Sequence, residues 1–148
     1  MPLAYQTITD LSLQLPLFVY GTLLPGERNY PRFLAGRTQS ETPASVSGEL
    51  WWVAEEDYPY LCRGDELIHG YLVSIVDQFY SATVRAIDLL EDFHPDHPSA
   101  SLYQRRSIEV VNPPGRELAW TYFWTDRQRP GIKLTTGDFS ARWQNSKG

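Results

Sequence analysis

The 148-residue chain is predicted to fold as a mixed α+β domain with several strands and one principal helix. Two observations predict this class. Several short segments show the apolar runs or alternation typical of strands, and one stretch without Gly or Pro has its apolar residues at helical spacing. No repeat or composition break divides the chain, so residues 1–148 are expected to form a single domain with its core at about 15–140.

Five segments are predicted as strands because they are apolar or alternating and are bounded by turn residues. They are residues 15–20, 46–53, 67–76, 103–111 and 118–125. Pro16 stands at the start of the first, where proline is tolerated. The third is apolar enough to be buried on both faces. The turn at 112–115, Asn-Pro-Pro-Gly, makes the last two strands neighbours.

The segments between the strands are predicted as loops and a short helix. Residues 29–34 can begin that helix, residues 35–45 are Gly-, Ser- and Thr-rich, and residues 55–65 are rich in turn formers. The polar lead at 1–14 and the tail after Arg142 are expected to be loosely held.

The stretch from Asp77 to Phe93 is predicted as an amphipathic helix with Asp77 as its N-cap. At about 100° per residue, Glu91 falls between Val84 and Ile87 on the apolar side. Burial disfavours the charged form of a carboxyl group. We therefore expect the pKa of Glu91 to rise toward the range that suits a general base.

The same pattern places Asp88 and Asp92 on the polar arc, where they are expected to be solvated. A second interpretation fits Glu91 equally well on geometry alone. In that interpretation Glu91 is a carboxylate at a helix end that is paired with Arg105 or Arg106.

A glycine-bearing loop, residues 20–24, follows the first predicted strand. Gly21 permits a positive φ or a close approach of a ligand, and the three amides that follow it are free to bind a carboxylate or another anion. An ordinary strand-to-turn junction is the commoner use of such a segment. The spacing to Gly26 matches a phosphate loop, but Glu27 stands where that loop needs Lys, which disfavours nucleotide binding.

Composition narrows the possible partners. The net charge of −5 argues against nucleic acid and anionic membranes, because phosphate contacts need clustered Lys and Arg. The single cysteine, Cys62, excludes an intrachain disulfide and fits a reducing compartment. No signal peptide or 18-residue apolar run is visible, so a cytoplasmic location is predicted.

Other catalytic patterns are weaker. Cys62 lacks a histidine in a suitable context, so a small buried or loop thiol is the better interpretation. His94 and His97 lack a third ligand, and no metal is expected. The five tryptophans could form a carbohydrate platform, but aromatic residues on alternating strands are more often core.

Eight short motifs in a fixed order resemble the γ-glutamylcyclotransferase-like superfamily, which includes γ-glutamylamine cyclotransferases and AIG2-like proteins. The resemblance covers about Leu17 to Phe139. The motifs are Tyr20-Gly21-Thr22-Leu23, Gly48-Glu49-Leu50-Trp51, Tyr58-Pro59, Gly70-Tyr71-Leu72-Val73, Asp88-x-x-Glu91, Tyr103-x-Arg105, Ala119-Trp120-Thr121-Tyr122 and Gly137-Asp138-Phe139.

This resemblance implies a small, mostly antiparallel, barrel-like sheet with flanking helices. It also implies an enzyme of the lyase or acyltransferase type that releases 5-oxoproline from a small γ-glutamyl compound without a cofactor. Glu91 matches the position of the catalytic glutamate of the family. The substrate-binding residues implied by the resemblance are Tyr20, Gly21, Thr22, Leu23 and Tyr103.

Two residues depart from the pattern of the family. Asp92 stands where a glycine often follows the glutamate, and Leu90 stands where an aromatic residue often precedes it. These departures leave a second hypothesis open, in which the same cavity serves a non-catalytic module that binds a small molecule or a partner. The leaving amine and the oligomeric state are not indicated by the sequence.

Overall fold

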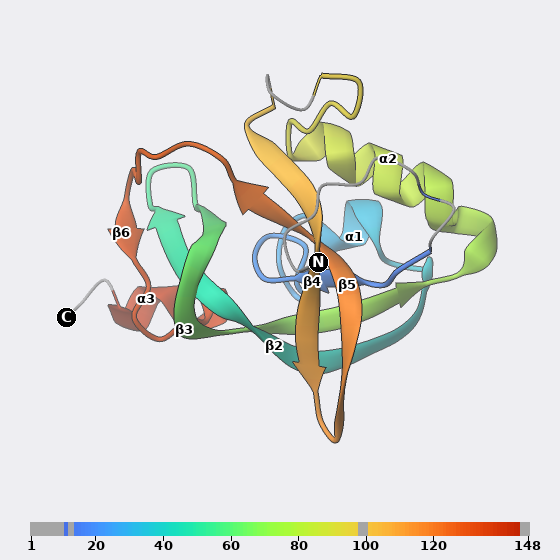
Figure 1. Ribbon diagram of the computed structural model, residues 1–148, viewed down its shortest axis with the longest axis horizontal. Coiled ribbons are helices and arrows are strands. Elements are labelled where there is room, and N and C mark those ends of the chain that lie inside the picture. The colour runs from blue at the N-terminus through green and yellow to red at the C-terminus, as the bar shows by residue number, and fades with distance from the viewer. Residues whose placement is uncertain (1–10, 12–13, 98–100, 146–148) are drawn as a thin grey trace, which may run out of the picture.

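The computed structural model describes residue 11 and residues 14–97 and 101–145. Most of the polar lead at 1–14 and the last three residues lie outside the described part, so the expectation for them stays a prediction. The elements along the chain are β1 (Leu17–Val19), α1 (Tyr30–Phe33), β2 (Thr38–Val53), β3 (Tyr58–Ile75), the 3-10 turn η1 (Asp77–Phe79), α2 (Tyr80–Leu90), β4 (Tyr103–Asn112), β5 (Gly115–Trp124), β6 (Ile132–Lys133), the 3-10 turn η3 (Phe139–Ala141) and α3 (Arg142–Asn145) (Figure 1).

The six strands form one sheet that curls round on itself. The strand order is β1-β3-β5-β4-β2-β6, and β3 also pairs with β2, which closes a ring of β2, β4, β5 and β3. The long pairings β2–β3 and β4–β5 are antiparallel, whereas the contacts of β5 with β1 and β3 are short and parallel. The predicted barrel-like α+β fold is thereby confirmed.

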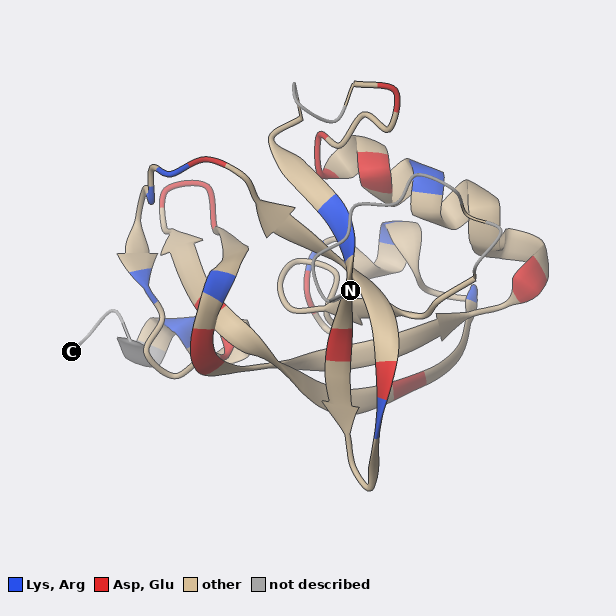
Figure 2. Cartoon of the chain, in the orientation of Figure 1, with Lys and Arg blue, Asp and Glu red and all other residues tan. Residues whose placement is uncertain are grey.

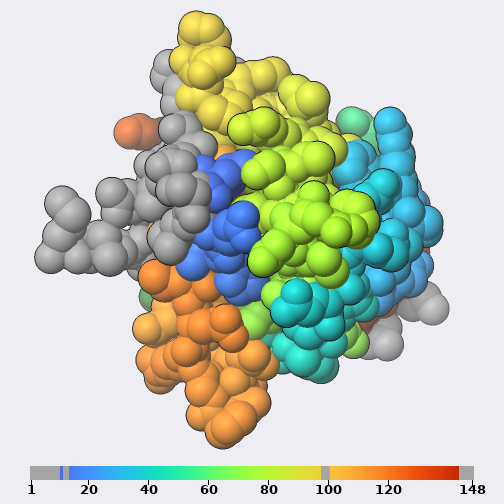
Figure 3. Space-filling view, turned by 90° about the vertical axis from the view of Figure 1, so that its right-hand side faces the viewer, coloured from blue at the N-terminus to red at the C-terminus, as the bar shows by residue number. Residues whose placement is uncertain are grey.

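The helices flank this ring. In Figure 1, α1 and α2 lie on the same side of the molecule, and α3 lies near β3 and β6 at the other end. Figure 3 views the side on which α2, in yellow-green, lies between the dark-blue residues near the start of β1 and the light-blue segment around α1. Of the helices in the described part of the chain, none is long and apolar enough to cross a membrane.

The β2–β3 hairpin is much longer than the sequence predicts. Residues 38–45 were expected as loop and 58–65 as turns, yet both are strand. Residues 38–45 are mostly polar and half-buried or exposed, whereas residues 59–62 are buried. Both segments pair across the hairpin, so tertiary pairing overrides local propensity. A register shift between Gly48 and Glu49 lets the two long strands bend around the core.

The stretch 67–75 is strand, but it is buried on both faces only at the successive residues Leu72 and Val73, and not along its whole length as predicted. Leu67 is 58% exposed and Ile68 is fully buried, so this part of β3 alternates like an antiparallel strand with one solvated face. Trp52 and Trp120 are buried in the core, which confirms the core interpretation for these two, whereas Trp143 is exposed. Cys62 is a buried thiol, as expected.

The predicted helix is present in its main part, but its ends differ from expectation. Asp77 is not an N-cap, because it lies inside η1 and neither η1 nor α2 begins with a side-chain capping hydrogen bond. The helix α2 ends at Leu90, and Glu91 is its C-cap residue.

Candidate active site

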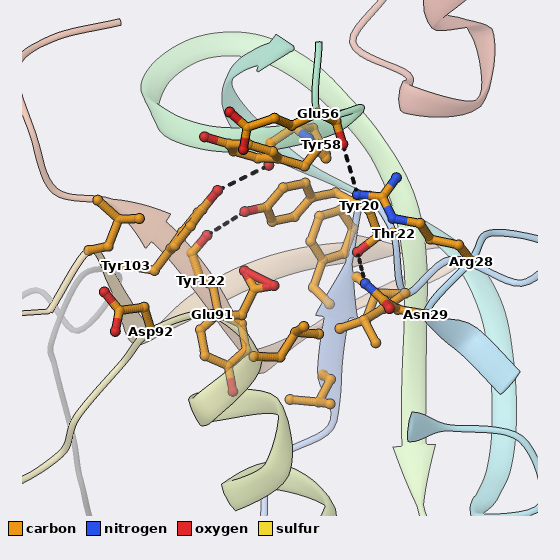
Figure 4. Close-up of a pocket in the computed structure, with 18 residues that line it drawn as sticks. Tyr20, Thr22, Arg28, Asn29, Glu56, Tyr58, Glu91, Asp92, Tyr103 and Tyr122 are labelled. Carbon is orange, nitrogen blue, oxygen red and sulfur yellow. Dashed lines mark hydrogen bonds between the residues drawn. The ribbon is translucent and has the colours of Figure 1, made fainter. Parts of the chain in front are cut away.

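A cavity of about 320 Å³ opens between the end of α2, the loop after β1, and the strands β4 and β5 (Figure 4). Every residue that the sequence singled out for a site lines this cavity: Tyr20, Gly21, Thr22, Leu23, Glu91 and Tyr103. Tyr20 and Tyr103, which lie 83 positions apart in the chain, therefore meet at the same cavity. Their roles stay predictions, but the geometry brings them together.

Glu91 reaches the cavity because of the way in which α2 ends. The amide of Phe93 donates to the carbonyl of Asp88 (2.8 Å), and the amide of Asp92 donates to that of Leu89 (3.1 Å). These two bonds are a Schellman motif, which requires a left-handed residue at the position of Asp92. Asp92 has a φ of 52° and supplies it.

This ending explains one departure from the family pattern. A glycine adopts the left-handed conformation without strain, and aspartate is among the few other residues that tolerate it. Asp92 therefore preserves the turn that aims Glu91 into the cavity. Leu90, the other departure, is 37% exposed and lines the cavity beside Glu91.

The Glu91 carboxylate is unpaired. Within the described part of the chain it has no hydrogen-bond or ion-pair partner, and burial raises its pKa from 4.5 to about 7. This is the direction that the sequence predicts, and the cause is desolvation. The alternative pairing with Arg105 does not occur, because Arg105 binds Asp88 instead.

Asp88 was expected to be solvated, and this expectation is wrong. It is 3% exposed and accepts bonds from Nε of Arg105 (2.9 Å) and from the hydroxyl of Tyr122 (2.5 Å). Asp88 lies one turn before Glu91, at the border of the apolar arc. A partner on β4 draws its side chain inward, and the pattern of one helix carries no information about such a partner.

Three buried tyrosines surround Glu91 in Figure 4. The hydroxyl of Tyr20 donates to the carbonyl of Tyr122 (2.7 Å), and the hydroxyl of Tyr103 donates to the carbonyl of Pro59 (3.2 Å). Burial raises the pKa of all three phenols, so they stay neutral. Sequence reasoning did not select Tyr122, although its place opposite Arg105 in the β4–β5 pairing provides a signal.

The loop after β1 is shaped by contacts with the β2–β3 hairpin. Gly21 was expected to admit a ligand or a positive φ; instead it admits the ring of Pro59, which a Cβ at this position would overlap. The amide of Leu24 is bonded to the carbonyl of Gly21 (3.0 Å), so it is not free as expected. The amides of Gly21, Thr22 and Leu23 make no backbone bond within the described residues.

The mouth of the cavity is charged. Arg28 lines it and donates to the backbone carbonyls of Glu56 and Asp57 in the β2–β3 turn. Acidic residues gather in this turn and at the last turn of α2 (Figure 2). Asp57 is held by Arg142 of α3 (Nε to Oδ1, 2.7 Å), which ties the C-terminal helix to the rim of the cavity.

The chain is similar in sequence to known proteins. It matches the family model described as gamma-glutamyl cyclotransferase, AIG2-like, over residues 17–143. It is 31% identical, over 108 residues, to the gamma-L-glutamyl-butirosin B gamma-glutamyl cyclotransferase of Niallia circulans. The aligned region covers 73% of this chain and 65% of that relative, so the chain spans less than two thirds of its length.

Solved structures show the same fold. YkqA from Bacillus subtilis has a TM-score of 0.65 at 24% identity, covering 90% of this chain and 42% of that one. An AIG2-like protein from Mus musculus has a TM-score of 0.57 at 23% identity, covering 78% and 80%.

Proposed function

Because the chain belongs to the gamma-glutamyl cyclotransferase, AIG2-like family, we propose that it releases 5-oxoproline and a free amine from a small γ-glutamyl compound, with Glu91 as general acid and base. The observation that carries this proposal is the unpaired Glu91 carboxylate, whose pKa is raised to about 7 inside a cavity of about 320 Å³. A carboxyl group with this pKa can both take and return a proton near neutral pH.

The proposed reaction is an intramolecular acyl transfer. The α-ammonium of the substrate loses a proton to Glu91, and the resulting amine attacks its own γ-carbonyl carbon. A five-membered ring forms with a tetrahedral oxyanion. The bond from this carbon to the leaving nitrogen then breaks, and the proton on Glu91 passes to that nitrogen. Of the two hydrogens left on the attacking nitrogen, one stays as the N–H of 5-oxoproline and the other ends on the released amine, which leaves as an ammonium, so no water is consumed and no cofactor is needed.

The cavity supports this reaction in two ways. Its volume is at the lower end of small-molecule sites, which suits a glutamyl group held in a folded conformation with the rest of the substrate toward the mouth. Holding that conformation favours ring closure by proximity. The amides of Gly21, Thr22 and Leu23 are the available backbone donors for a developing oxyanion or for the α-carboxylate.

The test is product formation with a panel of γ-glutamyl amines and γ-glutamyl amino acids. The wild type should release 5-oxoproline, and Glu91→Gln should lose at least about 10²-fold in kcat/KM. Glu109→Gln, the same change at an exposed site on β4, is the matched control and should keep full activity. In H₂¹⁸O the 5-oxoproline should carry no label, because the ring closes without water.

Two results would contradict the proposal. Turnover by Glu91→Gln within about twofold of wild type would remove the assigned base. Thermal stabilisation by γ-glutamyl ligands without any 5-oxoproline would instead identify a non-catalytic binding module that uses the same cavity.

A further inference from the structure

The mouth of the cavity carries exposed leucines that the proposed reaction does not use. Leu90 and Leu102 line the cavity and are 37% and 40% exposed, and Leu89, one residue before Leu90, is 70% exposed. The amide of Leu102 donates to the carbonyl of Asp92 (3.1 Å), which joins the residue before β4 to the end of α2. Leu90 and Leu102, here called the leucine ledge, therefore continue the cavity outward as an apolar rim.

Two carboxylates share the mouth with the leucine ledge. Glu56 in the β2–β3 turn and Asp92 after α2 are exposed, and both line the cavity. Among the described residues, neither lies within ion-pair distance of a Lys or an Arg, and the Glu56 carboxylate accepts no hydrogen bond. One oxygen of Asp92 contacts Nε2 of His94 at 2.7 Å, and the other is open. Figure 4 shows Glu56 beside Tyr58, and Asp92 on the side of the cavity opposite Arg28.

The two arginines nearest the mouth already have counter-ions. Arg28 donates to the carbonyls of Glu56 and Asp57, and its guanidinium lies 3.5 Å from the Asp57 carboxylate. Arg142 binds the carboxylates of Asp57 and Glu27. Two guanidiniums therefore face two carboxylates, and this group of four side chains carries no net charge.

Glu56 and Asp92 consequently make the mouth negative. The buried, unpaired Glu91 carboxylate points into the same cavity and adds to this field when it is ionised. Carboxylates around a site favour a cationic ligand and repel an anionic one. The leucine ledge favours methylene groups, since burial of apolar surface is favourable. A leaving group that suits both features is a short aliphatic chain with a cationic end.

We propose that the substrate carries, on its leaving nitrogen, an aliphatic spacer that lies on the leucine ledge and a distal cationic group that faces Glu56 and Asp92. The inference rests on the proposed function for the γ-glutamyl part, and it adds the class of the leaving amine, which is a diamine and not an amino acid. Glu56, Asp92 and Leu102 are then specificity-determining residues. Asp92 has this role in addition to its left-handed place in the turn, which glycine would fill without a charge.

Three substrates of matched chain length test the charge. They are the γ-glutamyl amides of 1,4-diaminobutane, butylamine and 4-aminobutanoate, whose chains end in an ammonium, a methyl group and a carboxylate. We expect kcat/KM for the ammonium compound to be about fivefold above the methyl compound and more than about tenfold above the carboxylate compound. These ratios should shrink as NaCl rises from about 0.01 M to about 1 M, because the carboxylates of the mouth are exposed to solvent.

Two variants assign the charge preference to residues. Glu56→Gln and Asp92→Asn should each lower the ratio of kcat/KM between the ammonium and carboxylate compounds by about threefold. Asparagine tolerates the left-handed conformation, so the turn after α2 is kept. Arg28 uses the backbone carbonyl of Glu56, so Glu56→Gln leaves that bond in place. Glu55→Gln, at an exposed neighbour outside the cavity lining, is the matched control and should leave the ratio unchanged.

A second pair of variants tests the leucine ledge. Leu102→Ala should lower the ratio of kcat/KM between the γ-glutamyl amides of butylamine and methylamine by about threefold, because the longer chain loses apolar contact. Leu118 is 37% exposed on β5 and lies outside the cavity lining. Leu118→Ala is therefore the matched control and should leave this ratio unchanged.

The outcomes separate the two proposals. If wild type releases 5-oxoproline from the three matched substrates with equal kcat/KM at low salt, the class of the leaving amine is wrong and the proposed reaction stands. If none is turned over, calorimetric titration of the same compounds decides. Tighter binding of the ammonium compound that Glu56→Gln weakens supports the cation site and overturns the reaction, whereas equal or absent binding overturns both. An unchanged ratio in both Glu56→Gln and Asp92→Asn overturns the role of these carboxylates.

Discussion

Asp88 and Arg105 form a buried ion pair one helical turn before Glu91. The Arg105 side chain is fully buried and that of Asp88 is 4% exposed, with Nε and Nη2 of the guanidinium 2.9 and 3.3 Å from the two carboxylate oxygens. The guanidinium also lies over the ring of Trp120. The pair therefore fastens the last turn of α2 to β4 and holds Glu91 at the cavity.

Removal of one partner should be costly. Asp88→Asn leaves the Arg105 charge buried without its counter-ion, and we expect the free energy of unfolding to fall by about 3–5 kcal/mol. Urea unfolding measures this. The matched change at an exposed site, Asp77→Asn, should stay within about 0.5 kcal/mol of wild type. A loss below about 1 kcal/mol for Asp88→Asn would show that the pair does not fasten the helix.

The sequence predicted which residues line the cavity better than it predicted the ion pair between Asp88 and Arg105. The positions of Glu91 and of the loop after β1 follow from local patterns, namely an apolar arc and a strand that ends at a glycine. The place of Asp88 depends on Arg105, which arrives from β4, seventeen residues later in the chain. A periodicity argument treats each element alone, so it assigns a border carboxylate to solvent unless a distant partner is known.

The fold shows the same limit. The strands with clear alternation, such as 103–111, were predicted correctly. The first part of β2 was expected to be loop because residues 35–45 are rich in Gly, Ser and Thr. Its strand character comes from pairing with the apolar segment Leu72 to Ile75. Long-range pairing of this kind leaves no local signature.

A second prediction follows from the left-handed conformation of Asp92. Aspartate tolerates a φ of 52° better than most residues, but glycine adopts it with no steric cost. Asp92→Gly should therefore stabilise the protein by up to about 1 kcal/mol, even though the exposed contact with His94 is lost. Asp92→Ala, which keeps the Cβ and loses the polar side chain, should be destabilising. Thermal unfolding of the pair measures both. If Asp92→Gly were no more stable than Asp92→Ala, the left-handed turn would not explain why aspartate stands at this position.

The charge on Glu91 should lower stability above neutral pH. Its folded-state pKa of about 7 exceeds 4.5, so the folded protein binds more protons than the unfolded chain between these values. The contribution of protonated Glu91 to the free energy of unfolding is therefore fully present below about pH 4.5 and is lost as the pH rises through about 7. The difference between these two pKa values corresponds to roughly 3 kcal/mol of unfolding free energy, as an upper estimate.

Glu91→Gln should therefore be more stable than wild type at pH 8 and about equal to it at pH 4, where Glu91 is neutral. Urea unfolding at the two pH values, with Glu109→Gln as the exposed control, gives the comparison. An equal effect of Glu91→Gln at both values would mean that burial does not raise the pKa of this group.

The same ionisation should govern the rate. A general base must be unprotonated to accept the α-ammonium proton, so kcat/KM should fall about tenfold per pH unit below about pH 7, instead of below 4.5. The pH dependence of kcat/KM reports ionisations of the free enzyme and the free substrate. Two γ-glutamyl substrates with different leaving amines should therefore share this acid limb, because they share the glutamyl group. A rate that stays constant down to pH 5, or an acid limb that moves with the leaving amine, would assign the limb to a group other than Glu91.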